Sequence, residues 1–338
     1  MLQSACNTND LLRSFLSQVQ ALVPRSRFSL QRLAPGGTPR VSRPIASVSP
    51  AQATFHRPVF IVSAPRSGST MLFDLLSTLS GVWTIGGESH ALESDLPALH
   101  PAAHDFDSNR LLASDLTPAL RGQVIPWFLA RLRDRRRVRW STLTDHCKPK
   151  TLRLLEKTPK NSLRIPFLHA LFPDARFIYL CRAPQPCLAS MMEGWRSRQF
   201  VAYRNLPGWP YREWSFLLVP NWRTLAQTSL ATLVAEQWRA ANSAILDDLE
   251  GLPRQNWCRI HYEDLIQEPA IALAMLSRFC ELEWTDETSA LLSASLPVSR
   301  QSLSLPSLDK WRKHEHEIAP VMHRLEPLLS RISALESQ

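Results

Sequence analysis

The sequence lacks the patterns that mark membrane-spanning, zinc-binding and repeat proteins. No apolar run approaches the roughly 18 to 20 residues that cross a bilayer, and the start of the chain lacks the basic-then-apolar order of a secretory signal. The six cysteines form no C-x-x-C pair and no zinc-like spacing, and no internal repeat is visible. We therefore expect no membrane span, no metal site and a cytoplasmic, reducing location for this chain.

Acidic residues are scarce at the start of the chain. Residues 1–57 hold seven Arg against Asp10 alone, so +6 of the net charge of +9 lies there. This local basic character argues against a nucleic-acid-binding surface over the whole chain. Residues 1–56 read as an amphipathic segment followed by a Pro/Ser/Arg-rich linker, either a docking helix or an organelle transit peptide. Residues 57–338 read as one domain with enough apolar sequence for a substantial core.

Apolar runs alternate with helical patterns along the domain, which predicts an α/β fold with a mostly parallel sheet flanked by helices. Two other stretches have two interpretations each. Pro126–Arg139 reads as an amphipathic helix whose Arg side chains form either a solvated face or a docking patch for an acidic partner. Residues 199–228, rich in Trp, Tyr and Pro, read as an acceptor pocket or as irregular packing. The expected strands are Val59–Val62, Gly81–Thr84, Leu152–Leu155, Ala175–Leu180 and Trp257–His261.

One strand, turn and helix organise the rest of the chain. The buried run Val59–Val62 enters a turn at residues 63–68, and a helix is expected to begin at Ser69. Such a turn points free backbone N–H groups outward at the positive end of the helix dipole, which favours binding of phosphate or sulfate. The candidate cradle comprises Arg66, Ser67, Gly68, Ser69 and Thr70.

This loop differs from a nucleoside-triphosphate loop in its cation. In the pattern G-x-x-x-x-G-K-[ST], Ser69 takes the place of the lysine that reaches the β- and γ-phosphates, whereas Arg66 lies inside the loop. The loop therefore favours a single 5′-phosphate-type group over a triphosphate. A nucleotide or small-molecule kinase is the alternative that this difference disfavours.

The run P-R-S-G-S-T-M-L, residues 65–72, resembles the 5′-phosphosulfate loop of sulfotransferases that use 3′-phosphoadenosine 5′-phosphosulfate (PAPS). The common loop of the cytosolic branch has Lys where Arg66 stands, so the resemblance is greater to the bacterial and tyrosylprotein branches. It implies a three-layer P-loop-like fold, PAPS as co-substrate without a metal, and sulfuryl transfer to a hydroxyl or amine.

A second phosphate-binding element is expected after the run Ala175–Leu180. Arg182 ends that strand, and Ser190 follows eight residues later in a helix, so a guanidinium and a hydroxyl can converge on one phosphate. The R-x7-S pattern is similar to the 3′-phosphate element of the same family. The tyrosylprotein branch has a further Arg where this chain has Gly194, with Arg196 nearby, so the third contact is left unassigned.

The catalytic residues follow from the resemblance. Lys157, in E-K-T-P-K, stands where the tyrosylprotein branch places a catalytic Lys, and with Arg66 it would stabilise charge on the leaving group. Glu88, in G-G-E-S-H, resembles the family's Glu after the first helix and is the expected base. His90 is the alternative base, because cytosolic members use a His in this region.

Two later segments extend the resemblance to about residue 315. Tyr262 lies in R-I-H-Y-E-D-L and would lie near the nucleotide, and Lys310 with Trp311 resembles the late K-W segment on the 3′-phosphate side. The acceptor is a small molecule, a lipid, a carbohydrate or a peptide tyrosine, and a homodimer is compatible with the sequence. A protein that binds 3′,5′-ADP without catalysis is a further alternative.

Overall fold

Short apolar runs form the strands of a six-stranded sheet. The structure, a computed structural model, describes residues 53–293 and 309–335, and every strand pair of this sheet within them is parallel. The strand order is β1-β4-β2-β5-β8, with β3 beside β4. The strands are β1 Thr54–Phe55, β2 Val59–Val62, β3 Val82–Trp83, β4 Thr151–Lys157, β5 Arg176–Cys181 and β8 Trp257–His261.

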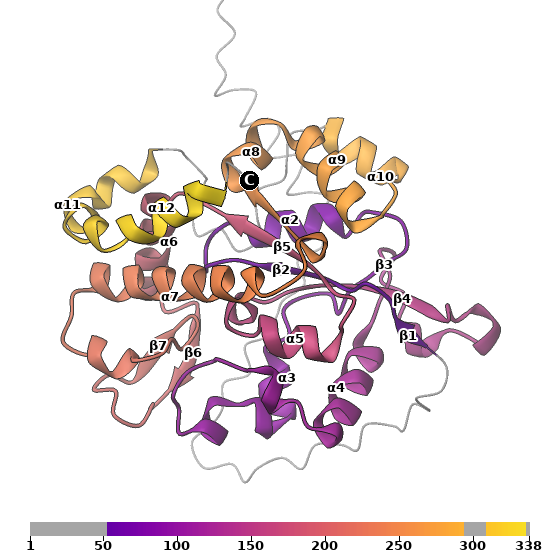
Figure 1. Cartoon of the computed structure of the whole chain (residues 1–338), viewed down its shortest axis with the longest axis horizontal. Coiled ribbons are helices and arrows are strands. Elements are labelled where there is room, and N and C mark those ends of the chain that lie inside the picture. The colour runs from indigo at the N-terminus through magenta and orange to yellow at the C-terminus, as the bar shows by residue number, and fades with distance from the viewer. Residues whose placement is uncertain (1–52, 294–308, 336–338) are drawn as a thin grey trace, which may run out of the picture. The chain divides into compact units, whose positions relative to one another are not determined.

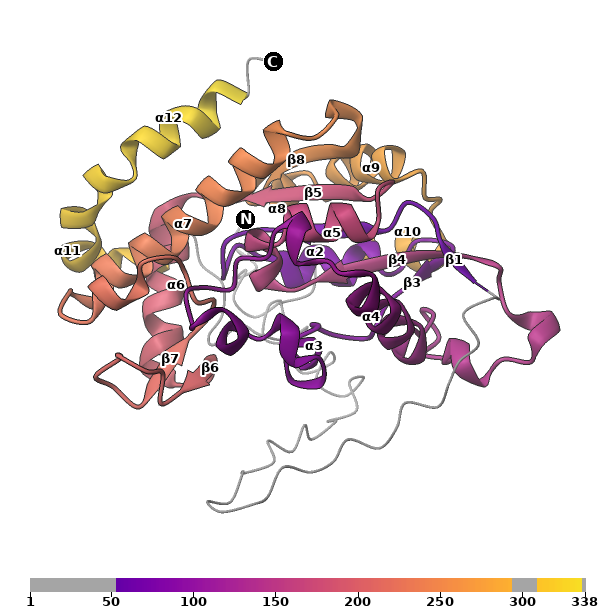
Figure 2. The ribbon, with the colours of Figure 1, turned by 60° about the horizontal axis from the view of Figure 1, so that its bottom comes forward.

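Helices cover both faces of the sheet (Figures 1 and 2). Alternate side chains of β2 point to opposite faces, so Phe60 and Val62 join one buried cluster whereas Val59 and Ile61 join another. In Figure 1, α2, α9 and α10 lie above the strands, and α4 and α5 lie below them. The helices are α2 Ser69–Leu76, α3 Ala91–Asp95, α4 Pro118–Arg131, α5 Ile165–Leu171, α6 Pro184–Ser197, α7 Leu230–Glu250, α8 Tyr262–Gln267, α9 Pro269–Cys280, α10 Asp286–Ser293, α11 Glu315–Ile318 and α12 Glu326–Ala334.

This architecture confirms the predicted three-layer, P-loop-like α/β fold with a parallel central sheet. All five expected strands are present, and β2 and β8 have the predicted bounds. The sheet begins slightly before residue 57, because β1 pairs with β4. The expected N-terminal docking helix and most of the linker lie outside the described residues.

The predicted helix over Pro126–Arg139 is wrong in its bounds. Helix α4 ends at Arg131, and the chain then returns along β3: Thr84 and Arg133 exchange two backbone hydrogen bonds of 2.9 and 2.8 Å. A tight turn follows, with Arg137 at φ 65° and Val138 N donating to the Asp134 carboxylate. All of these arginines except Arg131 therefore lie beyond the helix, in the segment beside β3.

The tryptophans of residues 199–228 belong to the core. Trp214 and Trp222 are fully buried, and Trp209 packs edge-on against both, with ring centroids 4.8 and 6.0 Å away. They lie around a two-stranded antiparallel ribbon, β6 Val201–Arg204 and β7 Glu213–Ser215. Of the two interpretations, irregular packing describes these three side chains.

Two findings on the described residues bear on the other expectations. No helix in 53–293 or 309–335 combines the length and apolarity needed to cross a membrane. Within these ranges every cysteine is a free thiol, and Cys181, Cys187 and Cys280 are buried.

Candidate active site

The turn after β2 folds as an open cradle at the N-terminus of α2. Ser67 and Ser69 are buried, Gly68 is the N-cap with φ 93°, and Arg66 also has a left-handed backbone with φ 67°. The first N–H groups of an α-helix have no partner within the helix, so those of Ser69 and Thr70 face the turn. The predicted strand, turn and helix are therefore present, with these N–H groups at the turn.

Tyr262, the first residue of α8, closes one side of this turn. A Cβ atom on Gly68 would overlap the Tyr262 ring, and Arg182 lies over the same ring with its guanidinium carbon 4.2 Å from the centroid. Glycine is therefore required at position 68 both by its backbone conformation and by the close approach of the ring.

Replacing Gly68 by Ala is expected to destabilise the protein by about 1–3 kcal/mol, because it adds backbone strain and overpacks the Tyr262 contact. Urea unfolding measures the difference. Gly122→Ala, in open space on α4, is the matched control and should stabilise by about 0.5–1 kcal/mol. Equal stability of the Gly68→Ala protein and the wild type would contradict this account of the turn.

The two predicted phosphate-binding elements meet at one edge of the sheet. Strands β2 and β5 are hydrogen-bonded neighbours, so their carboxyl ends bring Arg66 and Arg182 together. Arg182 Nη1 donates to the Arg66 carbonyl oxygen at 2.9 Å, and Arg66 Nε donates to Ser190 Oγ at 3.0 Å. Arg182 Nε is buried and has no hydrogen-bond partner among the described residues. Arg66, Arg182 and Ser190 therefore form one cationic cluster.

Two residues that support this cluster were missed by the sequence analysis. The Phe200 ring lies under the Arg66 guanidinium at 4.7 Å, and Cys187 Sγ lies 3.4 Å from Ser67 Oγ. Burial lowers the pKa of Arg66 and raises that of Cys187. The sequence could have indicated a role for Cys187, because it lies between Arg182 and Ser190.

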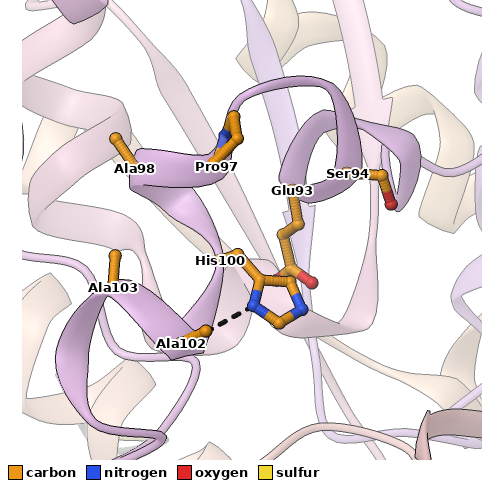
Figure 3. A pocket seen from close by; sticks show the side chains of 7 residues that line it. All are labelled: Glu93, Ser94, Pro97, Ala98, His100, Ala102 and Ala103. Carbon is orange, nitrogen blue, oxygen red and sulfur yellow. Dashed lines mark hydrogen bonds between the residues drawn. The ribbon is translucent and has the colours of Figure 1, made fainter. Parts of the chain in front are cut away.

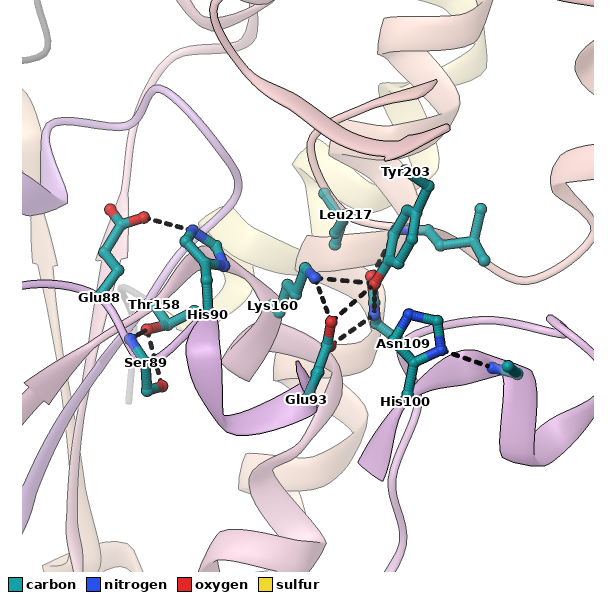
Figure 4. A network of polar contacts seen from close by, with 12 residues as sticks. Glu88, Ser89, His90, Glu93, His100, Asn109, Thr158, Lys160, Tyr203 and Leu217 are labelled. Atoms are coloured by element: carbon teal, nitrogen blue, oxygen red, sulfur yellow. Dashed lines mark hydrogen bonds and ion pairs between the residues drawn. The ribbon is translucent and has the colours of Figure 1, made fainter. Parts of the chain in front are cut away.

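Lys157 and Glu88 form a buried ion pair beside the cradle. Lys157 ends β4, its side chain is only 5% exposed, and its Nζ donates to Thr70 Oγ1 at 2.8 Å and to Glu88. The second Glu88 oxygen lies 2.6 Å from His90 Nε2 (Figure 4). Burial raises the pKa of Glu88, but the hydrogen bond from His90 and the charge of Lys157 together lower it to about 2. Glu88 is therefore ionised here and binds protons weakly.

The loop that carries Glu88 is fixed to the end of β4 by its neighbour Ser89. Ser89 N donates to Thr158 Oγ1 at 2.7 Å, and Ser89 Oγ donates to the fully buried Glu156 at 2.7 Å. Glu156 also accepts from Asn161, and burial raises its pKa. These contacts hold the Glu88 backbone beside Lys157.

A second buried network lies one helical turn further along, centred on Glu93 of α3 (Figure 4). Glu93 accepts from Lys160 and Arg164, and the Tyr203 hydroxyl donates to it at 3.1 Å. Burial raises the pKa of Glu93, but Arg164 and Lys160 lower it to about 2; burial lowers the pKa of Lys160 to about 8. This network connects α3 to the β6–β7 ribbon through Tyr203.

An open pocket of about 570 Å³ borders this network (Figure 3). His100 Nδ1 accepts from Ala102 N at 3.1 Å, so the proton of the neutral ring lies on Nε2. Burial lowers the pKa of His100, which favours that neutral form. Most of the side chains that line the pocket are small. The lining residues are Glu93, Ser94, Pro97, Ala98, His100, Ala102 and Ala103.

The last predicted segment lies against α6. Lys310 and Trp311 begin the 3-10 turn η9, Lys310–His314, and Trp311 packs partly buried against the larger core cluster. Lys310 Nζ donates to Glu193 at 2.6 Å, one turn after Ser190. The structure thus brings Lys310 to the helix that carries Ser190.

The cationic cluster and Lys157 both lie next to the N-terminus of α2, and the Glu88 carboxylate and the His90 imidazole lie beside Lys157. Such a set can bind an anion with two negative ends, stabilise charge on a leaving oxygen and accept a proton. In the described ranges no three His, Cys, Asp or Glu side chains come together in a way that would hold a metal ion.

Comparison with known proteins bears on this chemistry. A family model described as "Sulfotransferase family" matches residues 58–286. An uncharacterized protein of Aquifex aeolicus is 22% identical over 308 residues, 89% of this chain and 36% of that protein. Protein-tyrosine sulfotransferase A of Caenorhabditis elegans is 19% identical over 288 residues, 81% of this chain and 66% of that protein. The chain thus spans about a third of the first relative and about two thirds of the second.

A solved structure of a Mycobacterium avium sulfotransferase is also similar. It is 18% identical, and the match covers 81% of this chain and 77% of that one with a TM-score of 0.43.

Proposed function

This chain belongs to the sulfotransferase family, and on that premise we propose that it transfers the sulfuryl group of PAPS to a hydroxyl or amine of an acceptor. The observation that carries the proposal is the meeting of Arg66, Arg182 and Ser190 at the carboxyl ends of β2 and β5. A nucleotide with phosphates on both its 5′ and 3′ sides needs two adjacent cationic sites of this kind.

The donor's 5′ side is proposed to lie in the cradle and its 3′ side against α6. Arg66, with the N–H groups at Ser67–Thr70, would bind the 5′-phosphosulfate. Arg182 and Ser190 would bind the 3′-phosphate, with Lys310 and Trp311 from η9 beside them. Tyr262, held between Gly68 and Arg182, would contact the nucleotide at the same edge.

Catalysis would begin with a change of partner by Lys157. In the structure the Lys157 ammonium binds Glu88 and Thr70, and this pairing keeps the pKa of Glu88 low. A bound phosphosulfate competes for that ammonium, and a Glu88 carboxylate that loses the contact becomes a stronger base. Glu88 would then take the acceptor proton as the acceptor attacks sulfur and the S–O bond to the 5′-phosphate breaks. Arg66 and Lys157 would stabilise the leaving 3′,5′-ADP.

His90 is the alternative proton acceptor. Its ring lies against Glu88 at 2.6 Å, so an imidazole oriented by the carboxylate could take the acceptor proton instead. We further propose that the reaction takes place in the reducing cytoplasm. The acceptor would be a small molecule, a lipid or a carbohydrate.

Nucleotide-dependent thermal shifts test this function. We expect 3′,5′-ADP without metal to raise the Tm, because at one hundred times its Kd it should add about 3 kcal/mol to the free energy of unfolding. Mg-ATP should not raise the Tm. Arg182→Gln should lose most of the shift, because it removes the partly buried guanidinium that follows the carboxyl end of β5.

Two results would count against the proposal. Stabilisation by Mg-ATP alone would favour a kinase and contradict the proposal. Stabilisation by 3′,5′-ADP without transfer of labelled sulfate to any acceptor would favour a non-catalytic nucleotide-binding protein. The matched control is Arg198→Gln, an exposed arginine paired with Glu213, which should keep the full shift.

A further inference from the structure

Glu193 is contacted by two lysines and one histidine from a distant part of the chain. It lies on α6, and Lys310, Lys313 and His314 reach it from η9, more than 115 residues later. Lys310 Nζ binds one carboxylate oxygen at 2.6 Å, whereas Lys313 Nζ binds the other. His314 Nε2 lies 3.6 Å from that second oxygen. One carboxylate thus fixes the turn η9 against α6.

The position of Glu193 connects this contact to the donor site. Glu193 follows Ser190 by three residues, so the two side chains lie on the same face of the helix. Ser190 Oγ accepts from Arg66, and the charge of Glu193 is near enough to raise the pKa of Arg66 against the larger effect of burial. The carboxylate therefore borders the cationic cluster without being part of it.

Glu193 is charged and held in place. Its side chain is 16% exposed, compared with 25% for Lys310 and 53% for Lys313. Burial raises its pKa, but hydrogen bonds from Lys310 and Lys313 lower it to about 2. Glu193 is therefore ionised over the whole physiological pH range.

We propose that Glu193 is a positioning residue for the donor's 3′-phosphate, because it orders Lys310 and the η9 turn beside Ser190 before the nucleotide arrives. The inference rests on the proposed function. Ordering a long cationic side chain and its turn costs conformational entropy on binding, and a contact made in advance removes that cost. The effect is expected on the 3′ side, because Glu193 holds η9 against α6, the helix that carries Ser190.

The proposal makes a selective prediction about two nucleotides. In Glu193→Gln the Kd for 3′,5′-ADP should rise about three- to tenfold, as expected for one or two side chains that must be ordered on binding. The Kd for 5′-AMP, which has no 3′-phosphate, should stay unchanged. Isothermal titration of the full chain with each nucleotide measures both constants.

A matched control separates this role from general loss of a surface carboxylate. Glu213 is 13% exposed and binds Arg198 and Arg204, so it resembles Glu193 in burial and in having two main cationic partners. Glu213→Gln should leave both nucleotide affinities unchanged. Glu193→Asp keeps the charge and should recover part of the affinity for 3′,5′-ADP.

Several outcomes would overturn the proposal. Equal or tighter binding of 3′,5′-ADP by Glu193→Gln would mean that the carboxylate competes with the phosphate. Equal weakening of both nucleotides would mean a general structural role. If Glu193→Gln fails to fold, Lys310→Met must weaken 3′,5′-ADP selectively, and failure to do so overturns the proposal. Failure of the wild type to bind 3′,5′-ADP would instead overturn the proposed function itself.

Discussion

Replacing Glu88 by Gln is expected to lower kcat by about 10²–10⁴-fold, the usual contribution of a positioned base, while 3′,5′-ADP still binds. Gln has the size of Glu88 and keeps an oxygen that can accept from Lys157. The substitution therefore removes the negative charge of the pair but keeps its geometry. The effect is measured as transfer of labelled sulfate to an acceptor that the wild-type protein sulfates. Isothermal titration measures nucleotide binding.

The pH dependence of the same reaction adds a second readout. Glu88 has a pKa of about 2 while it is paired with Lys157 and His90. If the donor draws Lys157 away, the pKa rises, so the acidic limb should lie at higher pH in kcat than in kcat/KM for the free enzyme. His90→Gln is the companion variant. Full turnover in Glu88→Gln together with its loss in His90→Gln would assign the base to His90.

Replacing Glu93 by Ala is expected to destabilise the protein by about 3–5 kcal/mol, because it leaves the buried Lys160 and Arg164 without their carboxylate. The side chains of all three residues are at most 6% exposed, so water cannot replace the lost partner. Urea unfolding at pH 7 measures the difference. Glu213→Ala, whose arginine partners are more than half exposed, should cost less than about 1 kcal/mol.

Acid should remove the contribution of Glu93. Its pKa of about 2 in the folded state lies below the ordinary value of 4.5, so the ionised form is stabilised by folding. This stability is fully present above about pH 4.5 and is lost as pH falls toward 2. The difference between wild type and Glu93→Gln should therefore be smaller at pH 3 than at pH 7. A difference independent of pH would contradict the assignment of the charge to Glu93.

The elements that the sequence predicted well are those with the simplest physical cause. Val59–Val62 and Trp257–His261 are short apolar runs between turn residues, and both are strands of a sheet covered on both faces. The convergence of Arg66 and Arg182 followed from their places after two parallel strands, because carboxyl ends of such strands share one edge. The predicted parallel sheet was therefore enough to bring these two arginines, far apart in the sequence, to one edge.

What the sequence could not predict depends on tertiary packing. The end of α4 at Arg131 is set by hydrogen bonds between Arg133 and Thr84, far apart in the chain. The low pKa of Glu88 depends on where the Lys157 ammonium lies, and the contact of Glu193 with η9 joins segments without any local signal. Side-chain partners of this kind become visible only when the fold brings them together.

The hydrogen-bonded neighbours β2 and β5 have a consequence for how such a protein can diversify. The spacing of the two arginines that follow these strands is set by the backbone ladder between them. The pocket lined by Pro97, His100 and their neighbours is built on short helical turns outside that ladder. Substitutions and insertions there can change the shape of the pocket while the spacing of the arginines stays constant.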